Sequence, residues 1–123
     1  MYPNIASTYE AGLHILLQLQ TSSNACLTDC KAWRVFSAKL LQHHQLLLVG
    51  CTYHIFDSGG FTAAICLKES HITIHTWPEF ELLTLDIYLC NYQKNNAPKC
   101  QLLAQANIDY FKATVLQKHE IYR

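Results

Sequence analysis

Residues 69–76 alternate between two kinds of side chain. The even-numbered positions hold a serine, two isoleucines and a threonine, whereas the odd-numbered positions include His71 and His75. An alternation with a period of two is typical of a β-strand whose faces lie in different environments. Pro78 has no backbone N–H to donate to a sheet, so we expect the strand to end before it. Periodicity alone favours a polar strand face at a hydrated interface.

Short turns connect this strand to apolar segments on both sides. The turn Asp-Ser-Gly-Gly over residues 57–60 is the strongest in the chain and predicts a hairpin. Gly50 indicates a bulge in the preceding strand. After a polar lead over residues 1–11, we expect strands over residues 12–20, 45–56, 61–68, 69–76, 82–92 and 111–121.

Two helices complete the expected elements. Thr28 is the predicted N-cap of the first, which runs to about His43, and the second begins at residues 96–98 and ends near Asn107. The apolar face of the first helix is predicted from spacing alone, over Ala32, Val35, Phe36, the stem of Lys39 and Leu40. The order β-α-β-β-β-β-α-β predicts an α+β fold, a two-layer sandwich in which an antiparallel sheet has both helices on one face. The other face of the sheet is then open to a partner.

Composition bounds the class of protein. At 123 residues, 1–123, we expect a single domain. Half of the residues are hydrophobic and only 15% are charged, so we expect some apolar surface to be buried between subunits. The net charge is zero with a pI near 7, which gives no electrostatic reason to expect nucleic acid or an anionic membrane as a partner.

The same composition indicates a reduced, cytoplasmic protein. No run of 18 apolar residues is present, and the N-terminus lacks the basic and apolar regions of a signal peptide. The six cysteines have no metal-binding or CxxC spacing, so we expect free thiols, five of them serving in packing. His71 and His75 share a strand face without a suitably spaced acidic or cysteine ligand, and we therefore expect no metal site.

The segment Glu-Ser-His-Ile-Thr-Ile-His-Thr-Trp-Pro-Glu, residues 69–79, resembles the self-processing signature of the prokaryotic S-adenosylmethionine decarboxylases. Residues 52–56, 60–62 and 86–90 are also similar to segments of that family. Residues 12–14 resemble its opening strand, although Leu13 stands where the family often has arginine. The resemblance extends along most of the chain and needs no gap between residues 56 and 90.

This resemblance implies a proenzyme that cuts its own chain between Glu69 and Ser70. The β subunit would be residues 1–69 and the α subunit residues 70–123, with Ser70 converted to a covalent pyruvoyl group that serves as the cofactor. His75 matches the processing base and Cys90 the proton donor in decarboxylation. Thr62 stands at a family serine that steers processing; threonine keeps the hydroxyl but adds a methyl group and a stiffer χ1.

The implied substrate is S-adenosylmethionine, whose decarboxylated product serves spermidine synthesis. Phe56 matches the family position that stacks on adenine, and Glu79 the one that holds the ribose hydroxyls. Aromatic rings suit both a planar base and a sulfonium cation. The resemblance also implies a homodimer, or a dimer of αβ units, with sites near the interface. Trp77 is interpreted as structural.

Two alternatives stay open. Relatives in the family decarboxylate ornithine or arginine by the same pyruvoyl chemistry; such a substrate would need an acidic partner, for which Asp57, Glu79 and Asp86 are candidates. The chain could also be an uncleaved, non-catalytic homologue that acts as a binding module. Thr62 favours that alternative, whereas the joint presence of Ser70, His75 and Cys90 speaks against it.

Overall fold

One six-stranded sheet organises residues 9–91 and 94–123, which the computed structural model describes. Its strands lie in the order β2-β3-β4-β5-β1-β6, and all neighbours pair antiparallel. Residues 1–8 of the expected lead and Tyr92 of the expected fifth strand lie outside the described residues. The strands are β1 (Leu13–Gln20), β2 (Leu48–Ile55), β3 (Phe61–Leu67), β4 (Ser70–Trp77), β5 (Leu82–Leu89) and β6 (Thr114–Tyr122).

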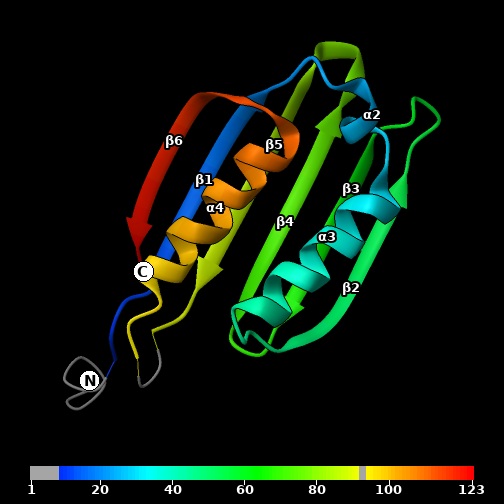
Figure 1. Ribbon diagram of the computed structural model, residues 1–123. Coiled ribbons are helices and arrows are strands. Elements are labelled where there is room, and N and C mark those ends of the chain that lie inside the picture. Colours follow the sequence, from blue (N-terminus) through cyan, green and yellow to red (C-terminus); the bar gives the residue numbers. More distant parts are fainter. Residues whose placement is uncertain (1–8, 92–93) are drawn as a thin grey trace, which may run out of the picture.

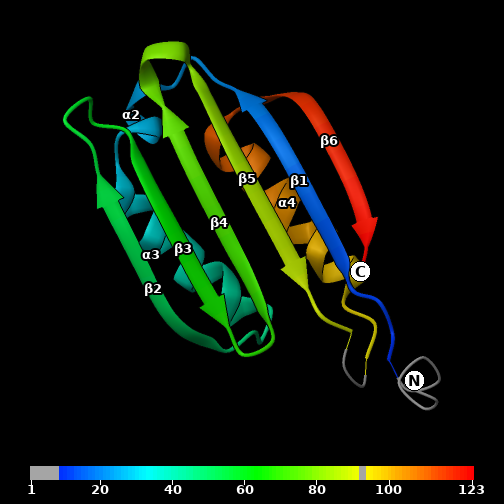
Figure 2. The same cartoon turned by 180° about the vertical axis from the view of Figure 1, so that it is seen from behind.

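Both long helices, α3 (Cys30–His43) and α4 (Ala97–Phe111), cover the same face of the sheet (Figure 1). The short helix α2 (Asn24–Leu27) and the 3-10 turn η1 (Pro78–Phe80) complete the elements. Seen from behind, the strands lie in front of the helices and the second face carries none (Figure 2). The predicted α+β sandwich with an open sheet face is therefore confirmed.

The expected two faces of β4 are also confirmed. Ile72, Ile74 and Thr76 are buried beneath the helices, whereas His75 is exposed on the other side. The strand ends where Pro78 begins η1, as its missing N–H requires. The face of the sheet without helices is here called the open face.

The core lies between the helices and the opposite face of the sheet. The alternating residues of β1, β3, β4 and β5 supply most of it, and Trp33 and Phe111 are fully buried contributions from α3 and α4. The indole Nε1 of Trp33 donates to the Oδ1 of Asn107 across 3.0 Å, so the one polar atom of this large side chain is satisfied inside the core.

Three details of the helices differ from the sequence predictions. Asp29, not Thr28, is the N-cap of α3, since its carboxylate accepts from the backbone N–H of Ala32; Thr28 ends α2 instead. The predicted apolar face of α3 is confirmed only in part: Phe36 and Leu40 are partly buried against the core, but the fully buried side chains are those of Cys30, Trp33, Ser37 and Leu41. The second long helix continues past Asn107 to Phe111, where Lys112 adopts a left-handed conformation and ends it.

The predicted hairpin and bulge are confirmed. Gly59 has φ of 89° in the turn between β2 and β3, a conformation that favours glycine. The register of β2 against β3 shifts between Leu48 and Gly50.

The environments of the cysteines differ. Cys30 and Cys100 are buried, and burial raises the pKa of the Cys100 thiol to about 12. Cys51 and Cys66 are exposed, so their interpretation as packing residues is wrong. Every helix within residues 9–91 and 94–123 is too short or too polar to span a bilayer.

Candidate active site

The predicted site residues form two groups, one at each end of β4. Glu69, Ser70 and Cys90 line a cleft of about 340 Å³, here called the serine cleft, together with Gln45, Leu46, Leu47, Leu67, Lys68, Lys94 and Asn96. Phe56, Thr62, His75 and Glu79 line a second cleft of about 300 Å³, here called the histidine cleft, together with Ser58, Thr76 and Trp77.

A tight hairpin positions the serine cleft. Lys68 and Glu69 form a two-residue turn between β3 and β4, so the peptide bond between Glu69 and Ser70 lies where an exposed turn enters a strand. Ser70 is the first residue of β4 and pairs with Leu89, the last residue of β5. This register brings Cys90 beside Ser70.

Both reactive side chains in the serine cleft are hydrogen-bonded. The hydroxyl oxygen of Ser70 accepts from the backbone N–H of Cys90 across 3.1 Å. The thiol of Cys90 donates to a carboxylate oxygen of Glu69 across 3.4 Å. A hydroxyl, a thiol and a carboxylate thus meet at the predicted scissile bond.

Sheet register also builds the histidine cleft. Thr62 on β3 lies directly opposite His75 on β4, and their side chains are joined by a hydrogen bond between Oγ1 and Nδ1. Phe56 follows β2, and Glu79 lies in η1. The pairing of a hydroxyl with an imidazole suits proton transfer.

Trp77 belongs to the histidine cleft, which the sequence interpretation missed. Its side chain is 37% exposed, and its ring centroid lies 6.1 Å from that of His75. Two aromatic rings, those of Phe56 and Trp77, and the carboxylate of Glu79 therefore share one cleft. The alternation of β4 could have indicated this, since Trp77 is two residues beyond His75.

The two clefts are far apart within one chain. Ser70 and His75 are separated by five steps along a strand, or roughly 16 Å at a rise of about 3.3 Å per residue. Ser70, the first residue of β4, lies at the rim of the sheet, whereas His75 is exposed on the open face. His75 therefore does not reach the Ser70 of its own chain.

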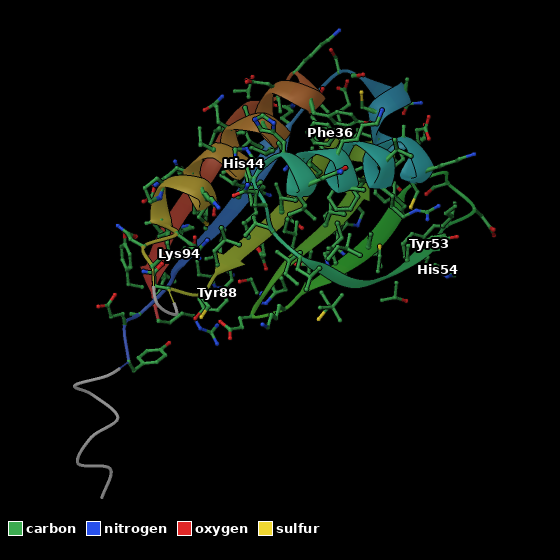
Figure 3. The ribbon with its side chains drawn as sticks, turned by 60° about the horizontal axis from the view of Figure 1, so that its bottom comes forward. Phe36, His44, Tyr53, His54, Tyr88 and Lys94 are labelled. Atoms are coloured by element: carbon green, nitrogen blue, oxygen red, sulfur yellow. The ribbon has the colours of Figure 1, made fainter. Side chains whose placement is uncertain are left out.

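Figure 3 labels residues that lie on the two sides of the sheet. Lys94, which lines the serine cleft, and Tyr88 of β5 lie at the end of the molecule where β5 leads into α4. Tyr53 and His54 lie along β2, the opposite edge of the sheet, and His54 pairs with Thr62.

A ring cluster lies on the open face, at the same end of the sheet as Ser70. His14 of β1, His71 of β4 and Tyr88 of β5 have ring centroids 5.7 Å apart in each pair. His14 is only 8% exposed, and burial lowers the pKa of its imidazole. Among the described residues, no group of three or more His, Cys, Asp or Glu side chains is arranged to hold a metal ion.

Comparison with known proteins identifies a family that this chain resembles along most of its length. The sequence model of the S-adenosylmethionine decarboxylase family matches residues 13–123. The chain is similar to the S-adenosylmethionine decarboxylase proenzyme of Picrophilus torridus, with 30% identity over 82% of this chain and 81% of that protein. The proenzyme of Prochlorococcus marinus is 32% identical over 76% of this chain and 75% of its own length.

A solved structure has the same fold. The adenosylmethionine decarboxylase from Aquifex aeolicus superposes with a TM-score of 0.76 at 24% identity, covering 94% of this chain and 90% of that chain. The likeness in fold includes nearly all of the present molecule.

Proposed function

The chain belongs to the S-adenosylmethionine decarboxylase family, and we propose that it works with a pyruvoyl group made from its own Ser70. As a member of the family it is a carboxy-lyase that releases CO2 from S-adenosylmethionine. The observation that carries the proposal is the serine cleft, where the bond between Glu69 and Ser70 lies in an exposed turn beside the thiol of Cys90. The proenzyme names of the relatives support a precursor that is processed.

Processing needs only the chain and water. The Oγ of Ser70 attacks the carbonyl carbon of Glu69; an ester bond forms, and the peptide C–N bond breaks. Loss of the α-proton of residue 70 then breaks the Oγ–Cβ bond and releases Glu69 as a carboxylate, which keeps that oxygen. The dehydroalanyl residue left behind takes up water and loses ammonia, giving a pyruvoyl end. The products are residues 1–69 and residues 70–123.

The residues of the serine cleft fit a pyruvoyl group. Such a group supplies a ketone that binds the substrate's amino group and withdraws electrons as CO2 leaves. Cys90 is beside residue 70, and we assign to its thiol the delivery of a proton to the substrate's α-carbon. The product would be the aminopropyl donor of spermidine synthesis.

The histidine cleft supports an adenosyl group as the other part of the substrate. We assign adenine stacking to Phe56 and the ribose hydroxyls to the carboxylate of Glu79. Trp77 adds a second ring to the same wall, and an aromatic wall suits the sulfonium charge as well.

We further propose that a complete site takes one cleft from each of two chains. Ser70 begins β4 at the rim of the sheet, and His75 lies on the open face near its other end. If two open faces pack about a twofold axis perpendicular to β4, the strands run in opposite directions, and each serine cleft meets a histidine cleft of the partner. Thr62 and His75 of one chain then act as the processing pair for Ser70 of the other. Exposed thiols such as those of Cys51 and Cys66 suit a reducing compartment, so we place this dimer in the cytoplasm.

Release of CO2 from a carboxyl-labelled substrate tests the assigned activity. S-adenosylmethionine should give CO2 at a rate that depends on Ser70, and ornithine or arginine should neither react nor compete. Faster release from an amino acid would overturn the substrate and leave the pyruvoyl chemistry. If a cleaved protein released CO2 from none of these three compounds, both the proposed substrate and the proposed pyruvoyl chemistry would be overturned.

A further inference from the structure

We infer that Asn96 is a positioning residue that holds Cys90 in place beside residue 70. This inference rests on the proposed function, in which Cys90 delivers a proton. The Nδ2 of Asn96 donates to the backbone carbonyl of Cys90 across 2.8 Å, and Asn96 lines the serine cleft. Nothing in the sequence motif around Ser70 indicates this residue.

Asn96 is unusual for its place in the fold. It is the N-cap of α4, where an asparagine normally turns its Oδ1 to the free N–H groups of the first helical turn. Here it makes no such bond, and the neighbouring Asn95 accepts from the N–H of Ala97 instead. The side chain of Asn96 is thus turned away from the helix and toward Cys90.

A second observation shows that this orientation is costly. Asn96 is only 8% exposed, and its Oδ1 has no hydrogen-bond partner among the described residues. A buried acceptor without a partner lowers stability. The orientation of the Asn96 side chain therefore provides a hydrogen bond to Cys90 and none to the first turn of α4.

The backbone of Asn96 is in turn held by a second asparagine, Asn91. The backbone N–H of Asn96 donates to the Oδ1 of Asn91 across 2.8 Å, and the Nδ2 of Asn91 donates to the carbonyl of Ala11. Cys90 is thereby connected, through two asparagines, to the chain segment that leads into β1.

Processing makes this support more important. Before cleavage, the backbone N–H of Cys90 donates to the Oγ of Ser70, and its carbonyl accepts from Asn96. Processing removes the Oγ of Ser70, which leaves with Glu69. Of these two side-chain anchors, the one from Asn96 is the one that remains during turnover.

Alkylation of Cys90 tests the contact without any pyruvoyl chemistry. The reagent is iodoacetamide, the site is read by peptide mass mapping, and the starting chain carries Ser70→Ala, which lacks the hydroxyl as the processed chain does. Adding Asn96→Ala or Asn96→Ser should speed alkylation of Cys90 severalfold, because the carbonyl of Cys90 loses its hydrogen bond from the Nδ2 of Asn96. Adding Asn95→Ala should leave the rate unchanged, although it removes the cap of α4.

Kinetics of the cleaved enzyme test the catalytic consequence. Asn96→Ala and Asn96→Ser should lower kcat for CO2 release by roughly tenfold to a hundredfold, as a small misplacement of a catalytic group does, with little change in KM. Asn96→Ser should keep the melting temperature, because serine caps helices well but is too short to reach Cys90.

The two experiments separate the possible failures. If alkylation responds to Asn96 but no chain is cleaved, the contact is established and the proposed function has failed. If both Asn96 variants match Asn95→Ala in alkylation and in kcat, the inference is wrong.

Discussion

The position of the Thr62 hydroxyl is set by the pairing of two neighbouring strands. This hydroxyl is joined to the Nδ1 of His75 because the register of β3 against β4 places the two residues opposite each other. The extra methyl group of threonine does not prevent that contact. The hydroxyl, and not the residue type, is therefore the feature that processing should require.

Replacing Thr62 with valine should slow cleavage of the chain by roughly tenfold or more, since valine keeps the shape but removes the hydroxyl that bonds to His75. Thr62→Ser should cleave at least as fast as the natural chain. The rate is followed by intact mass after synthesis. Thr73→Val is the matched control, as Thr73 lies on β4 two residues nearer Ser70 than His75 and on the same face of the sheet as His75. Equal cleavage by the two valine variants would contradict a role for Thr62.

The sequence predicted which residues belong to the site but not how they are grouped. The resemblance to a family motif predicted six of these residues, and each lines one of the two clefts: Ser70, His75, Cys90, Thr62, Phe56 and Glu79. Their roles stay predictions. The separation of Ser70 from His75 follows from simple strand geometry. Asn96 was missed because its contact with Cys90 depends on the turn of one side chain at a helix start.

At the scale of elements, strands were easier to predict than helix faces. A strand with a period of two can bury only one of two sets of side chains. In β4 the buried side chains are those of the apolar set, as the alternation predicted. On α3 two apolar stripes one residue apart both fit a helical period. Val35, of the predicted stripe, is 46% exposed, whereas Trp33 is fully buried because Asn107 of α4 accepts its N–H. That choice depends on a residue far away in the sequence.

The corrected start of α3 gives a stability test. Asp29→Ala should lower the free energy of unfolding by about 1 kcal/mol, because its carboxylate caps the N–H of Ala32. Thr28→Ala should cost less, since the Thr28 hydroxyl donates to the carbonyl of Asn24 at the end of the short helix α2. Urea unfolding of the uncleaved Ser70→Ala chain measures both. A larger loss from Thr28→Ala would restore Thr28 as the cap.

The ring cluster across β1, β4 and β5 predicts a dependence of stability on pH. Burial lowers the pKa of the His14 imidazole below 6.5; nearby His71 and Arg123 act in the same direction and Asp86 opposes them. The unfolded chain therefore binds a proton at His14 more readily than the folded chain does. The stabilisation is complete above pH 6.5 and is lost as the pH falls through the lower, folded value.

Replacing His14 with glutamine should make the free energy of unfolding fall less steeply as the pH drops below 6.5. Urea titrations of the Ser70→Ala chain at a series of pH values give the slope. His119→Gln, on the exposed edge strand β6, is the control for loss of a histidine. A slope unchanged by His14→Gln would contradict the assignment.

At the scale of the whole molecule, the separation of the two clefts predicts that a complete site requires a second chain. Chains with Ser70→Ala and with His75→Ala should each stay uncleaved alone. Produced together, they should form mixed dimers in which the His75→Ala chain is cut, because its Ser70 meets an intact His75 from the other chain. A size tag on one chain identifies the fragments.

The control for this complementation is a chain that carries both substitutions. Produced with the His75→Ala chain, it should give no cleavage, since neither chain supplies the imidazole. Absence of cleavage in the first mixture, despite formation of mixed dimers, would contradict a site shared between chains.

The most direct measurement of the central claim is the intact mass of the freshly purified protein under denaturing conditions, beside a Ser70→Ala control. The account predicts two fragments that divide between Glu69 and Ser70, with a ketone in place of the amino group at the start of residues 70–123, and one full-length mass for the control. A single full-length mass for the natural chain that persists on incubation would contradict it.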